Sequence, residues 1–215
     1  MNEYGIDPME KKAVKDGIKT IFKLAVVEKK IKILDYDELR GRNYISPDGS
    51  LEEYRSVNWY LQQGRLKSRN STQLNAHTIY GLCCEEITLS GYKHYYVLIL
   101  KSDIYKENTN FVIGAGGRGI CAIISTYRFK NLESDQKYEV IKTETMHEIG
   151  HVFDIPNDNR TTNVEENLGL HCTNECVMRQ GLHVPDDWIK MTNDRIKICK
   201  PLCDECISDL FILEK

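Results

Sequence analysis

The sequence predicts a mixed α/β (α+β) fold, and three features of its pattern lead to that prediction. Apolar residues at helical spacing fill the first part of the chain, and short apolar runs typical of strands fill its middle. One more helical pattern then leads into His-Glu-Ile-Gly-His, and a loop-rich region with clustered cysteines follows it. At 215 residues we expect a single domain over residues 1–215. Its N-terminal subdomain would cover 1–156 and a short C-terminal subdomain 157–215.

Three helices are predicted before the strands. The Asp-Pro pair at 7–8 is a typical helix start, because a capping aspartate precedes a proline in the first turn. The apolar residues that follow recur on one helical face, at Val14, Ile18, Ile21, Phe22 and Ala25. Ser50 and Glu53 have the spacing of a capping box and predict a second helix through Leu61. A third helix is expected over about residues 71–84.

The middle of the chain has the pattern of strands. Residues 95–100, 110–113 and 120–129 are rich in β-branched and aromatic residues and predict three of them. The glycine-rich segment 114–119 lies between the last two. A phosphate-binding loop would be followed by a helix, but another strand pattern follows here, so we interpret the segment as a flexible connection.

A helix over about residues 134–153 is predicted next. One of its sides carries Tyr138, Ile141, Thr145, Ile149 and Val152. After Pro156 the polar run at 157–167 is expected to be loop. A last, largely helical region is expected to begin at Pro185. The sheet would therefore precede the helix that carries the histidine motif.

Composition excludes several classes of partner. A net charge of −3 gives no electrostatic reason to bind nucleic acid or an anionic membrane. No apolar run approaches the roughly 20 residues that a membrane-spanning helix needs. The first residues are acidic where a signal peptide would be basic and then apolar, so we expect a cytoplasmic protein. The oligomeric state cannot be inferred from these features.

The His-Glu-Ile-Gly-His motif predicts a catalytic metal site. Residues four apart share one helical face, so His147 and His151 can point at the same ion. Glu148 is offset around the helix, where its carboxylate would reach a metal-bound water rather than the metal. A catalytic zinc takes three protein ligands and keeps one position for water, whose pKa it lowers. Glu148 would accept the proton during attack and later pass it to the leaving amine.

The third ligand has several candidates downstream of the motif. They are His171, Glu165, Glu166, Asp154 and His183. A third histidine would give a three-histidine site, whereas Glu165 or Glu166 would give two histidines and a carboxylate. We favour His171, because it follows the polar loop and directly precedes Cys172.

The eight cysteines predict a second metal site. In a reducing compartment clustered thiols are better interpreted as metal ligands than as disulfides. Two close pairs, one of them Cys-x-x-Cys, fit a closed tetrahedral zinc site formed by Cys172, Cys176, Cys203 and Cys206. Cys199 competes with Cys203 for one position. The other three, Cys83, Cys84 and Cys121, are interpreted as small buried apolar residues.

The segment 169–178, with sequence GLHCTNECVM, together with the motif at 147–151 and the later Cys-x-x-Cys, resembles the archaemetzincins. Segment 110–129 also resembles the paired strands of that family. The resemblance covers roughly residues 95–206. It implies a zincin fold of the metzincin clan and two zinc ions, one catalytic on three histidines and one structural on four thiolates. Met178 would be the methionine beneath the catalytic zinc.

The resemblance further implies that an extended peptide pairs with the strand at 120–128, with Ile120, Ala122 and Ile124 as candidate contacts. The chain also departs from the family pattern. Metzincins have a glycine three residues and a histidine six residues after the second histidine, where this chain has Asp154 and Asn157. We therefore expect a divergent member in which an insertion at about 157–168 loops out before His171. The first cysteine pair is separated by three residues instead of four.

These observations predict a zinc metallopeptidase that cleaves a peptide or protein substrate through water activated by Glu148. An alternative belongs to another class: a zinc-stabilised module that binds a peptide or partner protein without cleaving it. The sequence does not indicate substrate specificity.

Overall fold

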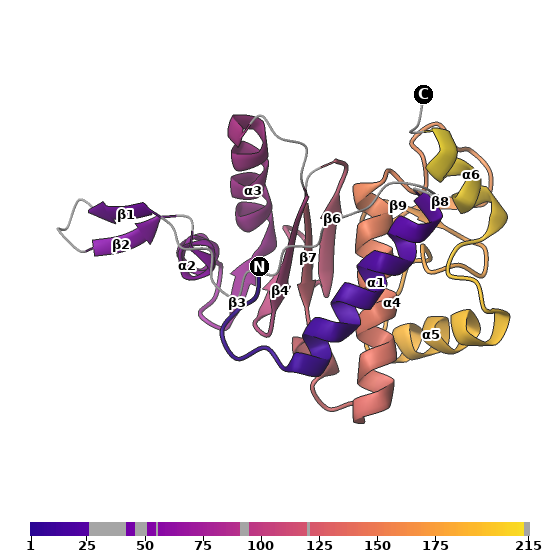
Figure 1. Cartoon of the computed structure of the whole chain (residues 1–215), viewed down its shortest axis with the longest axis horizontal. Coiled ribbons are helices and arrows are strands. Elements are labelled where there is room, and N and C mark those ends of the chain that lie inside the picture. The colour runs from indigo at the N-terminus through magenta and orange to yellow at the C-terminus, as the bar shows by residue number, and fades with distance from the viewer. Residues whose placement is uncertain (26–41, 46–50, 55, 91–94, 120, 213–215) are drawn as a thin grey trace.

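A three-stranded sheet lies at the centre of the computed structural model, which describes residues 1–25, 42–45, 51–54, 56–90, 95–119 and 121–212 (Figure 1). Its strand order is β4-β7-β6. Strand β4 (Tyr96–Leu100) runs parallel to β7 (Cys121–Ser125). Strand β6 (Gly114–Gly117) runs antiparallel to β7, with Gly114 opposite Ile124. The sheet is therefore mixed, as predicted.

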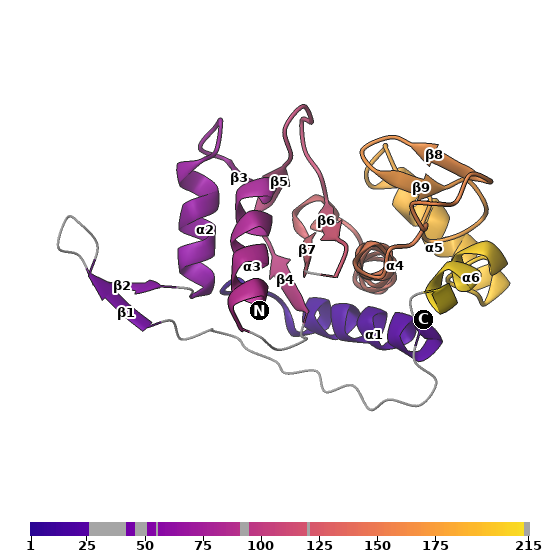
Figure 2. The same cartoon turned by 90° about the horizontal axis from the view of Figure 1, so that it is seen from above.

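Helices cover both faces of this sheet (Figure 2). On one face lies α3 (Ala76–Ser90), with α2 (Val57–Leu66) beyond it. On the other lies α4 (Ser134–Val152), and α1 (Pro8–Ala25) packs along α4. The C-terminal helices lie on the far side of α4 from the sheet. The site helix is thus enclosed between the sheet and the C-terminal part of the chain.

Strand β7 is buried on both faces, which explains its uninterrupted apolar sequence. Cys121 and Ile123 join the core that includes α2 and α3. Ala122 and Ile124 join the core that includes α1, α4 and the C-terminal segments. All four residues are fully buried, so β7 positions α4 against the sheet.

The other elements are short. Strands β1 and β2 pair antiparallel, β3 and β5 pair parallel, and β8 and β9 form an antiparallel hairpin. The bounds of these and the remaining elements are β1 Arg42–Ile45, β2 Leu51–Tyr54, β3 Gln73–Asn75, β5 Asp103–Tyr105, 3-10 helix Tyr127–Phe129, β8 Val164–Glu166, β9 Leu170–Cys172, α5 Asp186–Ile198 and α6 Asp204–Ile212. None of the described helices is long and apolar enough to cross a membrane.

Helix α4 ends in a defined turn. Asp154 has the left-handed backbone angle φ 60°. The N–H of Asp154 donates to the carbonyl of His151, and the N–H of Ile155 donates to that of Gly150 at 3.0 Å. This is the pattern that closes many helices, in which glycine is the usual left-handed residue and aspartate is tolerated. Asp154 thus serves the turn for which the family pattern has glycine.

Several predicted elements are confirmed. The first helix, strand β4 and helix α4 lie within one residue of their expected bounds, and α5 begins directly after Pro185. The side chain of Asp7 accepts a hydrogen bond from the N–H of Met9 at 2.7 Å, as expected of a helix cap. Cys83 and Cys121 are fully buried, and Cys84 is partly buried.

The predicted starts of the second and third helices are wrong. Residues 51–54 form β2, and Ser56 caps α2 instead, accepting a hydrogen bond from Trp59 N–H at 3.1 Å. Ser50 lies outside the described residues. The chain after residue 72 first forms β3, and Asn75 then caps α3 by accepting from Thr78 N–H. A short strand before a helix can carry the same residue spacing as a capping box.

Three strand predictions also need correction. Residues 110–113 form no strand, and Val112 makes only an isolated bridge with Ile104. The predicted strand 120–129 ends at Ser125, because the chain turns into a 3-10 helix in which Phe129 N–H donates to Thr126 O. The supposed loop at 157–167 contains β8, one strand of the hairpin that presents β9.

The glycine-rich connection is itself the edge strand β6. Strand β7 has partners on both sides, so its backbone groups are already used and no peptide can pair with it. The candidate substrate contacts Ala122 and Ile124 are therefore wrong, and both side chains are fully buried. Ile120 lies outside the described residues. Because β6 consists of three glycines and an alanine, it lacks the β-branched residues that identify a strand.

Candidate functional site

Three histidines converge at the C-terminal end of α4. His147 and His151 come from that helix, and His171 comes from β9 across the hairpin. One ring nitrogen of each lies within 4.8 Å of those of the other two. The Nε2 atoms of His147 and His151 are 3.1 Å apart. The segment between α4 and β9 therefore brings His171 back to the helix, and the set has the number and type of ligands that a catalytic zinc uses.

Backbone carbonyls orient the three rings. The Nδ1 of His147 is 2.7 Å from Val177 O, and the Nδ1 of His171 is 2.9 Å from Gly169 O. The ring of His151 makes a hydrogen bond with the backbone of Ile155. A ring that donates from Nδ1 keeps the lone pair on Nε2 for a metal, which is the usual arrangement of metal-binding histidines. The residues present thus fit a bound zinc ion.

The electrostatics of the cluster keep the rings neutral. Burial, followed by the neighbouring histidines, holds the pKa of His147 well below its ordinary value. Burial lowers the pKa of His151 to about 3, and burial also lowers that of His171. Neutral imidazole is the form that binds metal, so these shifts favour metal binding at neutral pH.

Glu148 lies beside this cluster in a buried position. Burial raises its pKa to about 7, although the charge of Lys106 and hydrogen bonds with Glu144 and the backbone of Gly116 act in the opposite direction. A carboxylate with a pKa near neutrality is well matched to accept and return a proton. The close approach of β6 depends on glycine, because a Cβ on Gly116 would overlap the backbone oxygen of Glu148.

Met178 forms part of the floor of the site. Its side chain is fully buried, and a Cβ on Gly150 would overlap its sulfur. The methionine therefore packs directly on the helix between the two motif histidines. Its neighbour Val177 supplies the carbonyl that orients His147, so this short segment contacts the site twice.

The four predicted cysteines form a second cluster, with sulfur atoms within 4.8 Å of one another. The Sγ atoms of Cys172 and Cys203 are 3.7 Å apart, and Cys203 N–H points at the Sγ of Cys176 at 3.4 Å. Four such thiolates fit a closed tetrahedral zinc site. Cys199 is exposed and lies outside the cluster, so it does not take the place of Cys203.

The other candidate third ligands lie elsewhere. Glu165 and Glu166 are exposed on β8, where Glu165 lies opposite His171 in the strand register. His183 is exposed in the loop before α5. Asp154 forms an ion pair with Arg118 at 2.6 Å instead of turning to the histidines. None of these four belongs to either cluster among the described residues.

A chain of polar contacts joins the end of α4 to the cysteine cluster. Asn157, at the position where metzincins have their third histidine, donates its side-chain amide to Asp154 at 2.9 Å. Its backbone N–H donates to Asp209 at 3.2 Å. Arg160 donates to the same carboxylate at 3.0 Å and to the sulfur of Cys206 at 3.3 Å. The two residues that depart from the family pattern are thus part of one network.

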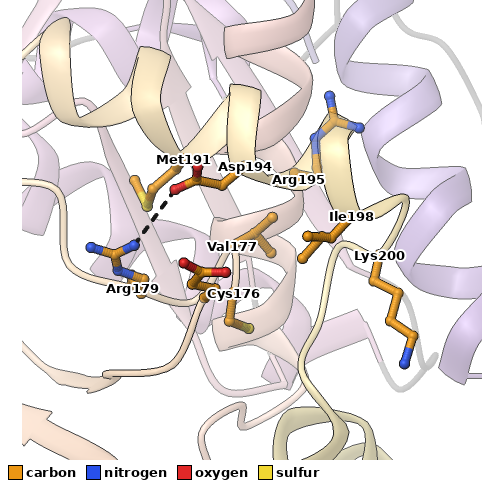
Figure 3. A pocket seen from close by; sticks show the side chains of 9 residues that line it. Cys176, Val177, Arg179, Met191, Asp194, Arg195, Ile198 and Lys200 are labelled. Carbon is orange, nitrogen blue, oxygen red and sulfur yellow. Dashed lines mark ion pairs between the residues drawn. The ribbon is translucent and has the colours of Figure 1, made fainter.

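A small hollow lies beside the cysteine cluster, between α5 and the segment after Cys176 (Figure 3). Arg179 and Asp194 face one another across it at 3.8 Å. None of the three histidines lines it. The hollow is therefore separate from the site at the end of α4.

The sequence pattern did not identify Glu144, Arg160 or the glycines of β6 as parts of the site. Glu144 precedes Glu148 by four residues, so the helical period places the two on one face, and this spacing was the available signal. Arg160 has no such signal, because its partners are distant in sequence.

A helix with two histidines and a glutamate, a third histidine from a later segment and a mixed sheet are the features of the zincin class. Comparisons with known proteins indicate which members of the zincin class this chain resembles. No family model matches the chain. A curated archaemetzincin from Nanoarchaeum equitans is 44% identical over 81 residues, which are 38% of this chain and 36% of that protein. An archaemetzincin from Archaeoglobus fulgidus is 37% identical over 112 residues, 50% of this chain and 54% of that protein.

The alignments span about half, or less, of the length of these relatives. Solved structures show the same fold over almost the whole chain. The crystal structure of archaemetzincin from Archaeoglobus fulgidus, complexed with malonate, has a TM-score of 0.55 at 22% identity and covers 97% of this chain and 96% of that one. The structure from Methanopyrus kandleri has a TM-score of 0.56 at 21% identity and covers 100% and 93%. The chain is archaemetzincin-like.

Proposed function

We propose that this chain is a zinc-dependent peptidase that hydrolyses peptide bonds with Glu148 as the general base. The observation that carries the proposal is the convergence of His147, His151 and His171, with the buried carboxyl group of Glu148 beside them. The curated archaemetzincins and the shared fold support it. The proposal includes two zinc ions per chain, one on the histidines and one on the four cysteines.

The roles of the residues follow from their placement. Zinc, when bound, supplies a Lewis acid that polarises the scissile carbonyl and makes a water molecule more acidic. The three histidines would hold the ion, and backbone carbonyls fix the rings of His147 and His171 through Nδ1, which leaves their Nε2 atoms available. Glu148 accepts a proton from the attacking water and passes it to the leaving amine. The cysteine cluster holds β9, and with it His171.

Strand β6 is the surface that we propose for the substrate. It is an edge strand, so one row of its backbone N–H and C=O groups has no partner strand among the described residues. It lies directly against α4, since side chains at Gly114 or Gly116 would overlap the helix residues Glu144 and Glu148. An extended peptide that pairs with this edge would pass close to the histidine cluster. This arrangement suits a peptide or protein substrate.

The test is the Glu148→Ala variant of the zinc-loaded protein, assayed against a mixed peptide library. We expect it to retain both zinc ions and to lose at least about a hundredfold in peptidase activity, the usual range for a general base. Glu165→Ala is the matched control, because Glu165 is exposed and outside the cluster, and it should retain activity and zinc. Equal turnover by wild type and Glu148→Ala would refute the mechanism. Intact recovery of a peptide that wild type binds would favour the non-catalytic binding module.

A further inference from the structure

Glu144 is a fully buried acidic residue on α4, one helical turn before Glu148. Neither of its carboxyl oxygens has a hydrogen-bond donor among the described residues. A buried carboxylate without a donor is strongly unfavourable, and such groups are rare in native structures. Glu144 is therefore expected to carry a proton, which removes the buried charge.

The carboxyl groups of Glu144 and Glu148 lie side by side against β6. A Cβ on Gly114 would overlap Oε1 of Glu144 and also Oε1 of Glu148. One small volume beside the strand therefore holds an oxygen from each residue, and only a glycine leaves room for both. The two groups are close enough to share a hydrogen bond, in which one must be the donor.

The environment determines which of the two carries the proton. Two adjacent buried carboxyl groups do not both ionise near neutral pH. Burial, and then the charge of Glu148, raise the pKa of Glu144 well above its ordinary value. The backbone N–H of Gly116 already donates to Glu148, whereas no donor reaches either oxygen of Glu144 among the described residues. Glu144 is thus the donor and Glu148 the acceptor.

We propose that Glu144 is a positioning residue for the general base: it stays neutral and donates its O–H to the Glu148 carboxylate. This inference rests on the proposed peptidase function and deepens it. The hydrogen bond holds one oxygen of Glu148 and leaves the other directed to the reacting water.

Two substitutions separate this role from simple packing. In Glu144→Gln the side-chain amide can still donate to Glu148, whereas in Glu144→Met a side chain of similar size cannot. We expect Glu144→Met to lower kcat by about ten- to a hundredfold, with little change in KM, because the base is no longer aligned. Glu144→Gln should remain within a few fold of wild type. Since Glu144 stays neutral throughout, the pH profile of Glu144→Gln should keep the wild-type shape.

A matched control and a metal measurement complete the kinetic test. Glu139→Gln changes a carboxyl group on the same helix that pairs with Arg195, and it should leave kcat unchanged. All variants should bind the same amount of zinc as wild type, so that a loss of turnover is not a loss of metal. Equal kcat for the Met and Gln variants, or a displaced pH profile in Glu144→Gln, would overturn the proposal.

An infrared measurement tests the proton without any activity. The zinc-loaded protein at pH 7 should show a C=O band of a protonated carboxyl group that is absent from Glu144→Gln and present in Glu139→Gln. If wild type shows no turnover but the band behaves as expected, the peptidase function fails while the assignment of the proton stands. If wild type is active and the band persists in Glu144→Gln, Glu144 is not the proton carrier and the inference is wrong.

Discussion

Gly150 lies between the two motif histidines, at the point where Met178 reaches α4. The sulfur of Met178 occupies the space that a Cβ on this residue would need. Met178 is fully buried, and the neighbouring Val177 carbonyl orients His147. Because Gly150 has no Cβ, the segment after Cys176 can pack directly against the helix that carries the two histidines.

We predict that Gly150→Ala lowers the free energy of unfolding by about 1–3 kcal/mol, the usual range for overpacking a core, and reduces zinc binding at the histidines. Gly81→Ala is the matched control. Gly81 lies in α3, where a Cβ would meet no atom within 4 Å, so alanine should stabilise the helix by about 0.5–1 kcal/mol. Chemical denaturation and metal analysis check both. Equal stability of Gly150→Ala and wild type would contradict the packing argument.

At this scale the sequence is informative where chemistry requires a fixed spacing. A spacing of four positions between two histidines and of three positions between two cysteines is what a metal site requires, and both spacings are visible without any structure. His171 could be favoured over Glu165 as the third metal ligand only because of its place after the polar loop and next to Cys172. Glu144 was missed because a buried carboxyl group has no pattern of its own until its neighbour is identified as a base.

The segment between α4 and β9 is the element in which this chain departs most from the metzincin pattern. Asp154 takes the left-handed position at the helix end, and Asn157 ties that position to Asp209 on α6. Arg160 then connects Asp209 to the cysteine cluster. Its side chain is almost fully buried, so its charge is compensated by Asp209, and it also donates to the sulfur of Cys206.

We predict that Arg160→Met weakens zinc binding at the cysteine cluster by about ten- to a hundredfold, the range known for residues that hydrogen-bond to metal ligands. Zinc release to a chelator, measured with a colorimetric indicator, gives the rate directly. Arg179→Met is the matched control: Arg179 is partly exposed and its ion pair with Asp194 is long, at 3.8 Å. Arg179→Met should release zinc at the wild-type rate. Equal release from Arg160→Met would show that the network does not support the cluster.

Elements with a long amphipathic or apolar pattern could be predicted, and those without one could not. Helices α1 and α4 and strand β4 have such patterns and were predicted within one residue. Strand β6 consists of glycine and alanine, because α4 packs so closely that larger side chains would overlap it. Strands β3 and β5 have three residues each, so their pairing depends on tertiary contacts rather than on a local pattern.

Across the whole molecule, one short strand joins the histidine cluster and the cysteine cluster. His171 and Cys172 are consecutive residues of β9, and consecutive side chains of a strand point to opposite faces. His171 therefore turns to α4 while Cys172 turns to the C-terminal cysteines. The N–H of Cys172 donates to Met178 O at 2.8 Å, and Val177 N–H donates to Pro201 O at 2.9 Å. The segments that carry the cysteines thus hold both His171 and the Val177–Met178 segment that packs against the histidine site.

This arrangement predicts an asymmetric dependence between the two centres. Wild type purified without added metal or chelator should contain two zinc ions per chain. The double variant Cys203→Ser/Cys206→Ser should lose the cysteine-bound ion and also bind the second ion more weakly, because β9 is no longer held. His147→Ala should lose only the ion at the histidines, since none of the cysteines depends on that ring. Cys199→Ser should keep both ions, because Cys199 is exposed and outside the cluster.

Elemental analysis combined with a zinc titration of each variant distinguishes the possibilities. The asymmetry is expected because Cys172 anchors β9, the strand that carries His171. The cysteines, in contrast, are held by their own backbone contacts with the C-terminal segment. Full affinity at the histidine site in Cys203→Ser/Cys206→Ser would mean that β8 alone positions His171. A loss of both ions in His147→Ala would mean that the dependence runs in the opposite direction, from α4 to the cysteines.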